Sequence, residues 1–178
     1  MGKYLIAKEF WFDAGHRMYG HDLLKDRGAQ LLKGKESILG WQRYKDIHPH
    51  GHTFRVKIFL ESMNLDAQYM IVDTDKVKRV IKEFMDIYDH AFLIGRDDPI
   101  KDKFLDLFKG CRIVVMDSVP TAETIVEEIF NFFDKRFRAL LDKEEYPRKF
   151  KIAEIQLHTA STAMAIYKPG YNNIKGDE

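Results

Sequence analysis

The sequence contains 178 residues, which is enough for one domain of ordinary size with its own hydrophobic core. Its 29 Lys and Arg nearly cancel its 28 Asp and Glu, and the net charge of +1 gives no global field that would hold nucleic acid or an anionic membrane. Because Cys111 is the only cysteine, no intrachain disulfide or thiolate cluster can form, and a metal site must use histidine and carboxylate ligands.

The sequence has no run of 18 or more apolar residues, so we expect no membrane-spanning segment. The first residues, MGKYLIAKEFWF, lack a long apolar core followed by small residues, so we also expect no signal peptide. The expected setting is the cytoplasm, with neither nucleic acid nor a membrane as a partner.

Two strands are predicted in the first third of the chain. Residues 3–14 are rich in β-branched and aromatic types, and residues 52–60 alternate between apolar and polar side chains. Residues 17–49 lie between them and show no steady period, so we interpret them as a long excursion over the surface. Long loops of this kind in compact domains are often functional.

Two amphipathic helices follow. The first runs from Asp75 to Tyr88 with Asp73 or Thr74 as its cap, and the second begins near Pro120 and Thr121. The apolar stripe of the second helix is predicted to consist of Ile125, Ile129, Phe132, Phe133, Phe137 and Leu140.

Three more strands complete the pattern. A short buried strand is predicted at residues 111–117, where Cys111 would be a small core residue, and a strand pair at 151–159 and 164–168. The predicted fold is a single α+β domain over residues 1–178, with a largely antiparallel sheet covered by helices on one face. The tail, residues 169–178, is expected to fray.

One group of histidines predicts a metal site. His50 and His52 are two residues apart at the start of a strand, so both side chains point to the same face. If the first two strands pair across the excursion, His16 comes opposite them. Three neutral imidazoles with one open position are the arrangement of a catalytic zinc site.

Each motif also has an ordinary structural explanation. A His-Gly-His sequence alone is a weak signal, and His48 is a nearby competing surface histidine. Asp89 and His90 are adjacent after the first helix, where an acid can orient a histidine for acid–base chemistry or merely cap the helix.

Taken together, these motifs resemble one known family. FxAGHR, HGHxF before an alternating strand, MIVDTDKVK, DHAFL, PTAE and a last long strand ending in Thr occur in order between about residues 5 and 168. This set is similar to the 6-pyruvoyl-tetrahydropterin synthase family, which includes the 6-carboxytetrahydropterin synthases of queuosine-type precursor pathways.

The resemblance implies a T-fold subunit, an antiparallel sheet with two helices on one side. Such subunits join their sheets into a barrel, as trimers stacked into hexamers, with active sites at subunit contacts. It also implies a pterin-like substrate, a Zn²⁺ cofactor and a set of site residues. These are the metal ligands His16, His50 and His52, the catalytic pair Asp89 and His90, and the substrate-binding residues Thr121, Glu123, His158 and Thr159.

Two positions depart from the family pattern. Asp46 occupies the place of the usual catalytic cysteine, and either Asp46 or His48 can act as the base in its stead, although Asp46 can also be a solvated loop acid. His158 occupies the place of the glutamate that anchors the pterin, and histidine cannot make that paired contact. Glu154 is too distant to substitute, which leaves Glu123 as the candidate anchor.

The leading hypothesis is a zinc-dependent lyase acting on dihydroneopterin triphosphate or a related pterin, with Arg17 and Arg43 as candidate phosphate contacts. A second is a T-fold protein that binds or modifies a different purine- or pterin-like heterocycle. A third is a metal-stabilised oligomer without an active site.

Overall fold

The computed structural model describes residues 2–19, 45–142, 150–160 and 163–170. These residues form one six-stranded sheet, in the order β4-β3-β1-β2-β5-β6, together with three α-helices and one short 3₁₀ helix, η1. The strands are β1 Tyr4–His16, β2 His50–Ser62, β3 Ala91–Gly95, β4 Ile113–Met116, β5 Lys151–Ala160 and β6 Ala163–Tyr167. The helices are η1 Lys45–Ile47, α4 Thr74–Tyr88, α5 Lys101–Leu107 and α6 Ala122–Asp142.

The strands predicted at residues 3–14, 52–60, 151–159 and 164–168 are confirmed, and they form an antiparallel unit. β1 and β2 are each 13 residues long and pair along their whole length, from Tyr4 opposite Ser62 to His16 opposite His50. β5 pairs antiparallel with β2, and β6 pairs antiparallel with β5. The alternating pattern of apolar residues therefore places one continuous face of these strands in the core.

The other part of the sheet differs from the expected one. β3 runs parallel to β1, and β4 runs parallel to β3, so the sheet is mixed. β3 and α5 were both missed, because β3 follows α4 almost directly and α5 has only seven residues, none of them buried. The chain thus has a third helix beside the expected two.

The strand expected at residues 111–117 is shorter and less buried than predicted. It begins at Ile113, its edge is unpaired among the described residues, and Val115 is 40% exposed. The interpretation of Cys111 as a core residue is wrong, because Cys111 precedes the strand and is exposed.

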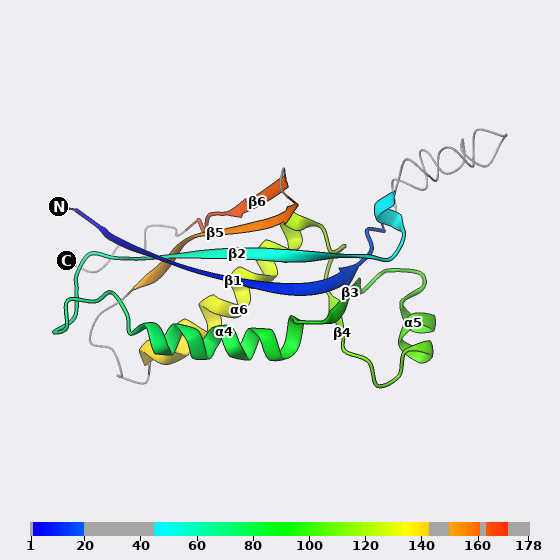
Figure 1. The fold of residues 1–178 in the computed structure, drawn as a ribbon, viewed down its shortest axis with the longest axis horizontal. Coiled ribbons are helices and arrows are strands. Elements are labelled where there is room, and N and C mark those ends of the chain that lie inside the picture. Colours follow the sequence, from blue (N-terminus) through cyan, green and yellow to red (C-terminus); the bar gives the residue numbers. More distant parts are fainter. Residues whose placement is uncertain (1, 20–44, 143–149, 161–162, 171–178) are drawn as a thin grey trace.

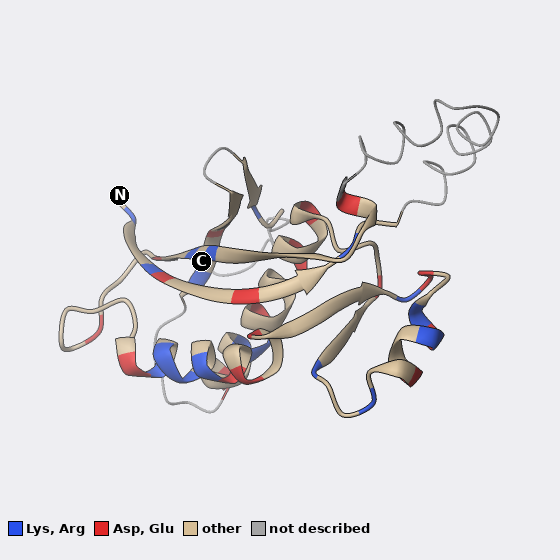
Figure 2. Cartoon of the chain, turned by 45° about the vertical axis from the view of Figure 1, so that its right-hand side comes forward, with Lys and Arg blue, Asp and Glu red and all other residues tan. Residues whose placement is uncertain are grey.

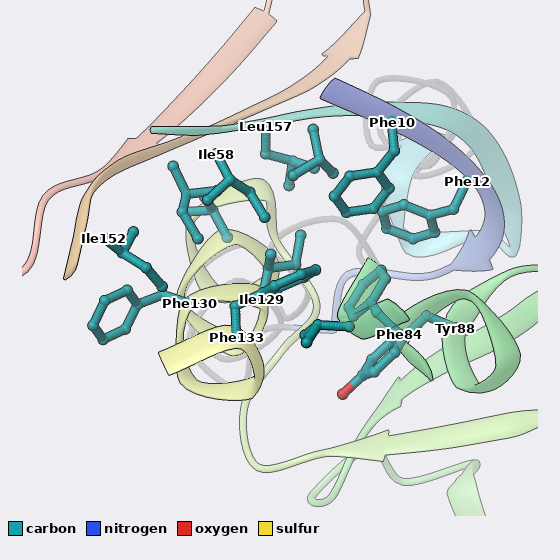
Figure 3. Close-up of a cluster of buried hydrophobic side chains, with 14 of the residues drawn as sticks. Phe10, Phe12, Ile58, Phe84, Tyr88, Ile129, Phe130, Phe133, Ile152 and Leu157 are labelled. Atoms are coloured by element: carbon teal, nitrogen blue, oxygen red, sulfur yellow. The ribbon is translucent and has the colours of Figure 1, made fainter. Parts of the chain in front are cut away.

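Helices α4 and α6 lie against one face of the sheet (Figure 1). In Figure 3, Phe10, Phe12, Ile58 and Leu157 project from the strands towards Phe84 and Phe133 of the helices. Phe84 is fully buried, and its ring lies 5.3–5.7 Å from the rings of Phe10, Phe12 and Phe133. Aromatic side chains thus fill the space between the two layers.

Helix α4 shows how local sequence signals produce this arrangement. The side chain of Asp73 accepts a hydrogen bond from the Asp75 amide, which confirms Asp73 as the cap. Figure 2 shows charged residues of both signs along α4, while its buried residues recur at helical spacing. Among the described residues, no helix is long and apolar enough to span a membrane.

Two predictions fall largely outside the described residues. The excursion at 17–49 is described only at residues 17–19 and 45–49, and the tail only at 169 and 170.

Phe84→Ala should lower the free energy of unfolding by about 3–5 kcal/mol, because it removes the ring that joins the two layers and leaves a cavity. Chemical denaturation monitored by circular dichroism measures this loss. Ile87→Ala on the same helix is the matched control, since Ile87 is 42% exposed and its truncation should cost less than about 1 kcal/mol. Equal losses for the two variants would contradict this account of the core.

Candidate metal and active site

Three histidines converge where β1 ends and β2 begins. His16 is directly opposite His50 in the antiparallel register, and His52 lies two residues further along the same face of β2. One potential ligand atom from each ring lies within 4.8 Å of the other two. The pairing predicted from the sequence is therefore confirmed, and it brings the three rings to one point.

Glycines make this approach of the two strands possible. Gly51 lies opposite Gly15, and a Cβ at Gly51 would lie 3.3 Å from the Ala14 carbonyl oxygen. A Cβ at Gly15 would lie 2.8 Å from Cδ2 of Phe92, which is too close for an unmoved ring. The strands therefore pack tightly beneath the histidines.

Backbone carbonyl groups hold the rings. Nδ1 of His16 donates to the Pro120 carbonyl oxygen at 2.7 Å, and Nδ1 of His50 donates to that of His48 at 2.8 Å. His52 has a hydrogen bond with the backbone of Thr159. Because Nδ1 carries the proton in His16 and His50, Nε2 of each neutral ring keeps a lone pair, as in metal-bound histidines.

The environment favours neutral rings. Burial lowers the pKa of His16 to about 4, and burial also lowers the pKa of His52. Nε2 of His16 is buried and has no hydrogen-bond partner among the residues that the structure describes. A buried lone pair that faces two other imidazoles is a suitable ligand for a divalent cation, so these three rings can together hold such an ion.

Asp46 lies next to this cluster in the short helix η1. Its Oδ1 is 3.8 Å from Nε2 of His50, and its side chain is 61% exposed. Its carbonyl oxygen accepts a hydrogen bond from the Met18 amide at 2.7 Å, which fixes the position of η1 beside the end of β1. His48 is exposed, and its carbonyl oxygen is the acceptor for His50.

Asp89 and His90 form a second group immediately after α4. Oδ2 of Asp89 lies 3.0 Å from Nδ1 of His90, and its Oδ1 accepts the Asp13 amide at 3.0 Å. Burial opposes ionisation, but these two hydrogen bonds and the charge of Arg112 lower the pKa of Asp89. The ionised carboxylate thus orients an imidazole that is 75% exposed.

This second group opens on the other face of the sheet. Neighbouring side chains alternate along a strand, so Asp13 and Thr53 face away from the helices while His16 and His52 face towards them. His90 shares an open cavity of about 440 Å³ with Asp13 and Thr53, whose side chains are hydrogen-bonded to each other at 2.5 Å. Of the histidine cluster, His52 also lines this cavity, whereas His16 and His50 do not.

The predicted substrate-binding residues divide in the same way. Thr121 follows Pro120 and caps α6, where its hydroxyl accepts the Thr124 amide at 3.3 Å. Thr159 lies against His52 through its backbone, so both threonines are next to the cluster. Glu123 is exposed in the first turn of α6.

His158 lies on the open face, across from Arg55 of β2. Arg55 in turn donates to a carboxylate oxygen of Glu9 at 2.5 Å. Glu154 is engaged by Lys168 at 3.1 Å and by Gln156 at 2.6 Å.

Among the described residues, neither candidate phosphate contact offers an unpaired arginine. Arg17 is buried with its Nε 3.1 Å from Oδ2 of Asp98, and Arg43 lies outside the described residues. The contributions of Asp13 and Arg112 to the Asp89–His90 pair were missed. No sequence signal indicates them, because they are 76 and 23 residues away from Asp89.

Comparison with known proteins agrees with the arrangement of these motifs. The family model described as 6-pyruvoyl tetrahydropterin synthase matches residues 5–170. The chain belongs to this family. It is therefore an enzyme of the tetrahydropterin synthase type, a lyase, and the α+β T-fold expected from the sequence is confirmed, apart from the parallel strands and third helix noted above.

Individual relatives cover nearly the whole chain. It is 30% identical over 169 residues to the 6-carboxy-5,6,7,8-tetrahydropterin synthase of Aquifex aeolicus, covering 93% of this chain and 98% of that one. The corresponding enzyme of Rickettsia typhi is 29% identical, with 82% and 89% covered.

Among solved structures, an uncharacterized protein from Wolinella succinogenes has a TM-score of 0.68 at 23% identity, covering 94% of this chain and 99% of that one. The 6-pyruvoyltetrahydropterin synthase of Plasmodium vivax has a TM-score of 0.62 at 14% identity, with 94% and 98% covered. These two likenesses concern the fold.

We expect the wild-type protein to bind about one metal ion per chain and His16→Ala to bind well below one, because two imidazoles alone make a poor site. Elemental analysis of the purified protein measures this. His48→Ala is the control and should keep its metal, since the carbonyl group that holds His50 belongs to the backbone. Full metal content in His16→Ala would exclude His16 as a ligand.

Proposed function

We propose that the protein is a zinc-dependent lyase of the 6-pyruvoyl-/6-carboxy-tetrahydropterin synthase type, acting on dihydroneopterin triphosphate or a related pterin. The observation that carries this proposal is the cluster of His16, His50 and His52, whose rings converge with backbone-held Nδ1 atoms. The relatives named 6-carboxy-5,6,7,8-tetrahydropterin synthase support the reaction class.

Three neutral imidazoles with no fourth protein ligand among the described residues favour catalytic zinc over structural zinc. When bound, the ion would polarise vicinal oxygens of the substrate side chain and acidify the neighbouring protons. The histidines hold the ion, and their backbone partners keep the rings from turning away.

Asp46 is proposed as the base that removes a proton from the substrate side chain. Its carboxylate is the acid nearest to His50 in the described chain, and it is accessible to a ligand. The solved Plasmodium vivax 6-pyruvoyltetrahydropterin synthase is a catalytic-residue mutant in which alanine replaces a glutamate, so a carboxylate serves as a catalytic residue in that enzyme. This precedent supports Asp46 over a thiolate, since Cys111 is exposed far along the chain.

The Asp89–His90 pair is proposed to act in a site formed between subunits. Within its own chain, His90 shares a cavity with His52 but not with His16 or His50, and we expect a second copy to bring the pair and a complete histidine cluster to one substrate. His90, oriented by Asp89, then donates or accepts the second proton. The proposed assembly is the trimer or hexamer that the family resemblance implies, with Thr121, Glu123 and Thr159 near the substrate.

One observation favours the second candidate function, a protein that binds or modifies a different heterocycle. His158 stands at the position expected for the pterin-anchoring glutamate, and Arg55 lies opposite it in the strand register. Neither of these two residues provides a carboxylate. A site without that paired acceptor discriminates less strongly for the amino-pyrimidinone edge of a pterin.

The test is incubation of zinc-loaded protein with dihydroneopterin triphosphate, with separate detection of released triphosphate and of acetaldehyde. Turnover that is lost on zinc removal and restored on zinc addition supports the proposed lyase. No turnover, combined with tight calorimetric binding of another purine or pterin, would favour the second candidate. If zinc removal melts the assembly and no ligand binds, the metal has only a structural role.

Asp46→Ala should lower kcat by roughly 10²–10⁴-fold, the usual contribution of a general base, while zinc content stays at about one ion per chain. Steady-state kinetics and elemental analysis measure the two quantities. Asp102→Ala removes an equally charged side chain from the exposed surface of α5 and should leave both unchanged. Normal turnover by Asp46→Ala would eliminate Asp46 as the base.

A further inference from the structure

The peptide group between Asp89 and His90 is held from both sides. The His90 amide donates to the Asp13 carbonyl oxygen at 2.6 Å. The Asp89 carbonyl oxygen accepts a hydrogen bond from Nη1 of Arg112 at 2.5 Å. The peptide plane between Asp89 and His90 is thus held by the backbone of β1 on one side and by the side chain of Arg112, just before β4, on the other.

This support is needed because His90 has an uncommon backbone conformation. Its φ is 59°, in the left-handed region that a residue with a Cβ rarely adopts. That conformation follows directly on Asp89, which ends α4 with an extended backbone, and it accompanies the 3.0 Å contact between the ring and the carboxylate. Strained residues of this kind persist only where the surroundings hold them.

Arg112 is well placed to supply this restraint. Its own carbonyl oxygen accepts the Phe92 amide at 2.9 Å, so its backbone is tied to β3 two residues beyond His90. Its side chain reaches back to Asp89 across 23 residues of sequence. Figure 1 shows β4 beside β3 at the end of the sheet where β1 terminates, and β3 begins at Ala91, directly after His90.

We propose that Arg112 is a positioning residue for the Asp89–His90 pair. By holding the Asp89 carbonyl group, it fixes the peptide plane and hence the direction in which the His90 imidazole leaves the sheet. The inference rests on the proposed acid–base role of that pair. Arg112 itself is not assigned a contact with substrate.

The ordinary alternative is that Arg112 only satisfies a carbonyl group at the end of α4, as cationic side chains often do. A cap of that kind contributes to stability and leaves the chemistry unaffected. A positioning role predicts that kcat falls by more than the lost stability can explain, while KM changes little. Acid–base groups act on the transition state, so misplacing them affects kcat and leaves substrate binding largely unchanged.

The experiment compares wild type, Arg112→Ala and Arg112→Lys in the zinc-loaded protein, with dihydroneopterin triphosphate as substrate. Arg112→Ala should lower kcat by roughly 10–100-fold while KM changes by less than about twofold. Guanidinium at concentrations far below those that unfold the protein should restore part of the kcat of Arg112→Ala, because the position is exposed. The kcat of Arg112→Lys should lie between those of wild type and Arg112→Ala, since one ammonium group replaces the guanidinium.

Arg136→Ala is the matched control. It removes an arginine that pairs with Glu83 at 3.0 Å between the two long helices, far from this peptide group, and should leave kcat unchanged. A crystal structure of Arg112→Ala adds a readout that needs no activity: φ of His90, or the separation of its ring from Asp89, should change.

Unchanged kcat in Arg112→Ala would overturn the proposal. So would a loss of kcat that follows the melting temperature and does not respond to guanidinium, or an unaltered His90 in the variant structure. If wild type itself shows no turnover, the proposed function fails, and the variant structure alone decides whether Arg112 holds His90.

Discussion

The antiparallel pairing of β1 with β2 is the constraint on which the rest of the structure depends. The register runs without interruption from Tyr4 opposite Ser62 to His16 opposite His50. Because side chains alternate, a slip of one residue would turn Phe54 and His52 to the other face together, emptying the core and dispersing the histidines. Packing and ligand geometry are therefore set by one register, and selection for a stable core also preserves the site.

The sequence predicted this region well because its signals are local and periodic. The alternation in β2, the helical spacing in α4 and the His-Gly-His sequence each lie within one element, and the structure follows them. β3 and α5 were not predicted because five apolar residues directly after a helix and a seven-residue helix without buried residues carry no period of their own. β3 is held by its pairing with β1 and β4, and α5 contacts β3 through the ring of Phe104, which stacks on that of Phe92 at 4.4 Å.

The same reasoning explains which parts of the site could be predicted from the sequence. The candidate ligands His16, His50 and His52 could be found from strand parity, whereas the groups that orient their rings could not. The carbonyl groups of Pro120 and His48 belong to the backbone, and a residue type does not reveal them. Backbone partners also leave the sequence at those positions free to vary, so the rings can stay fixed while neighbouring side chains change.

The hydrogen bond between the Met18 amide and the Asp46 carbonyl group has an evolutionary consequence. It brings the two ends of the intervening segment to one point beside the paired strands. A segment whose ends are already joined can gain or lose residues at a small cost in chain entropy, which grows only slowly with length. A change in the length of this segment should therefore leave the register of the paired strands undisturbed.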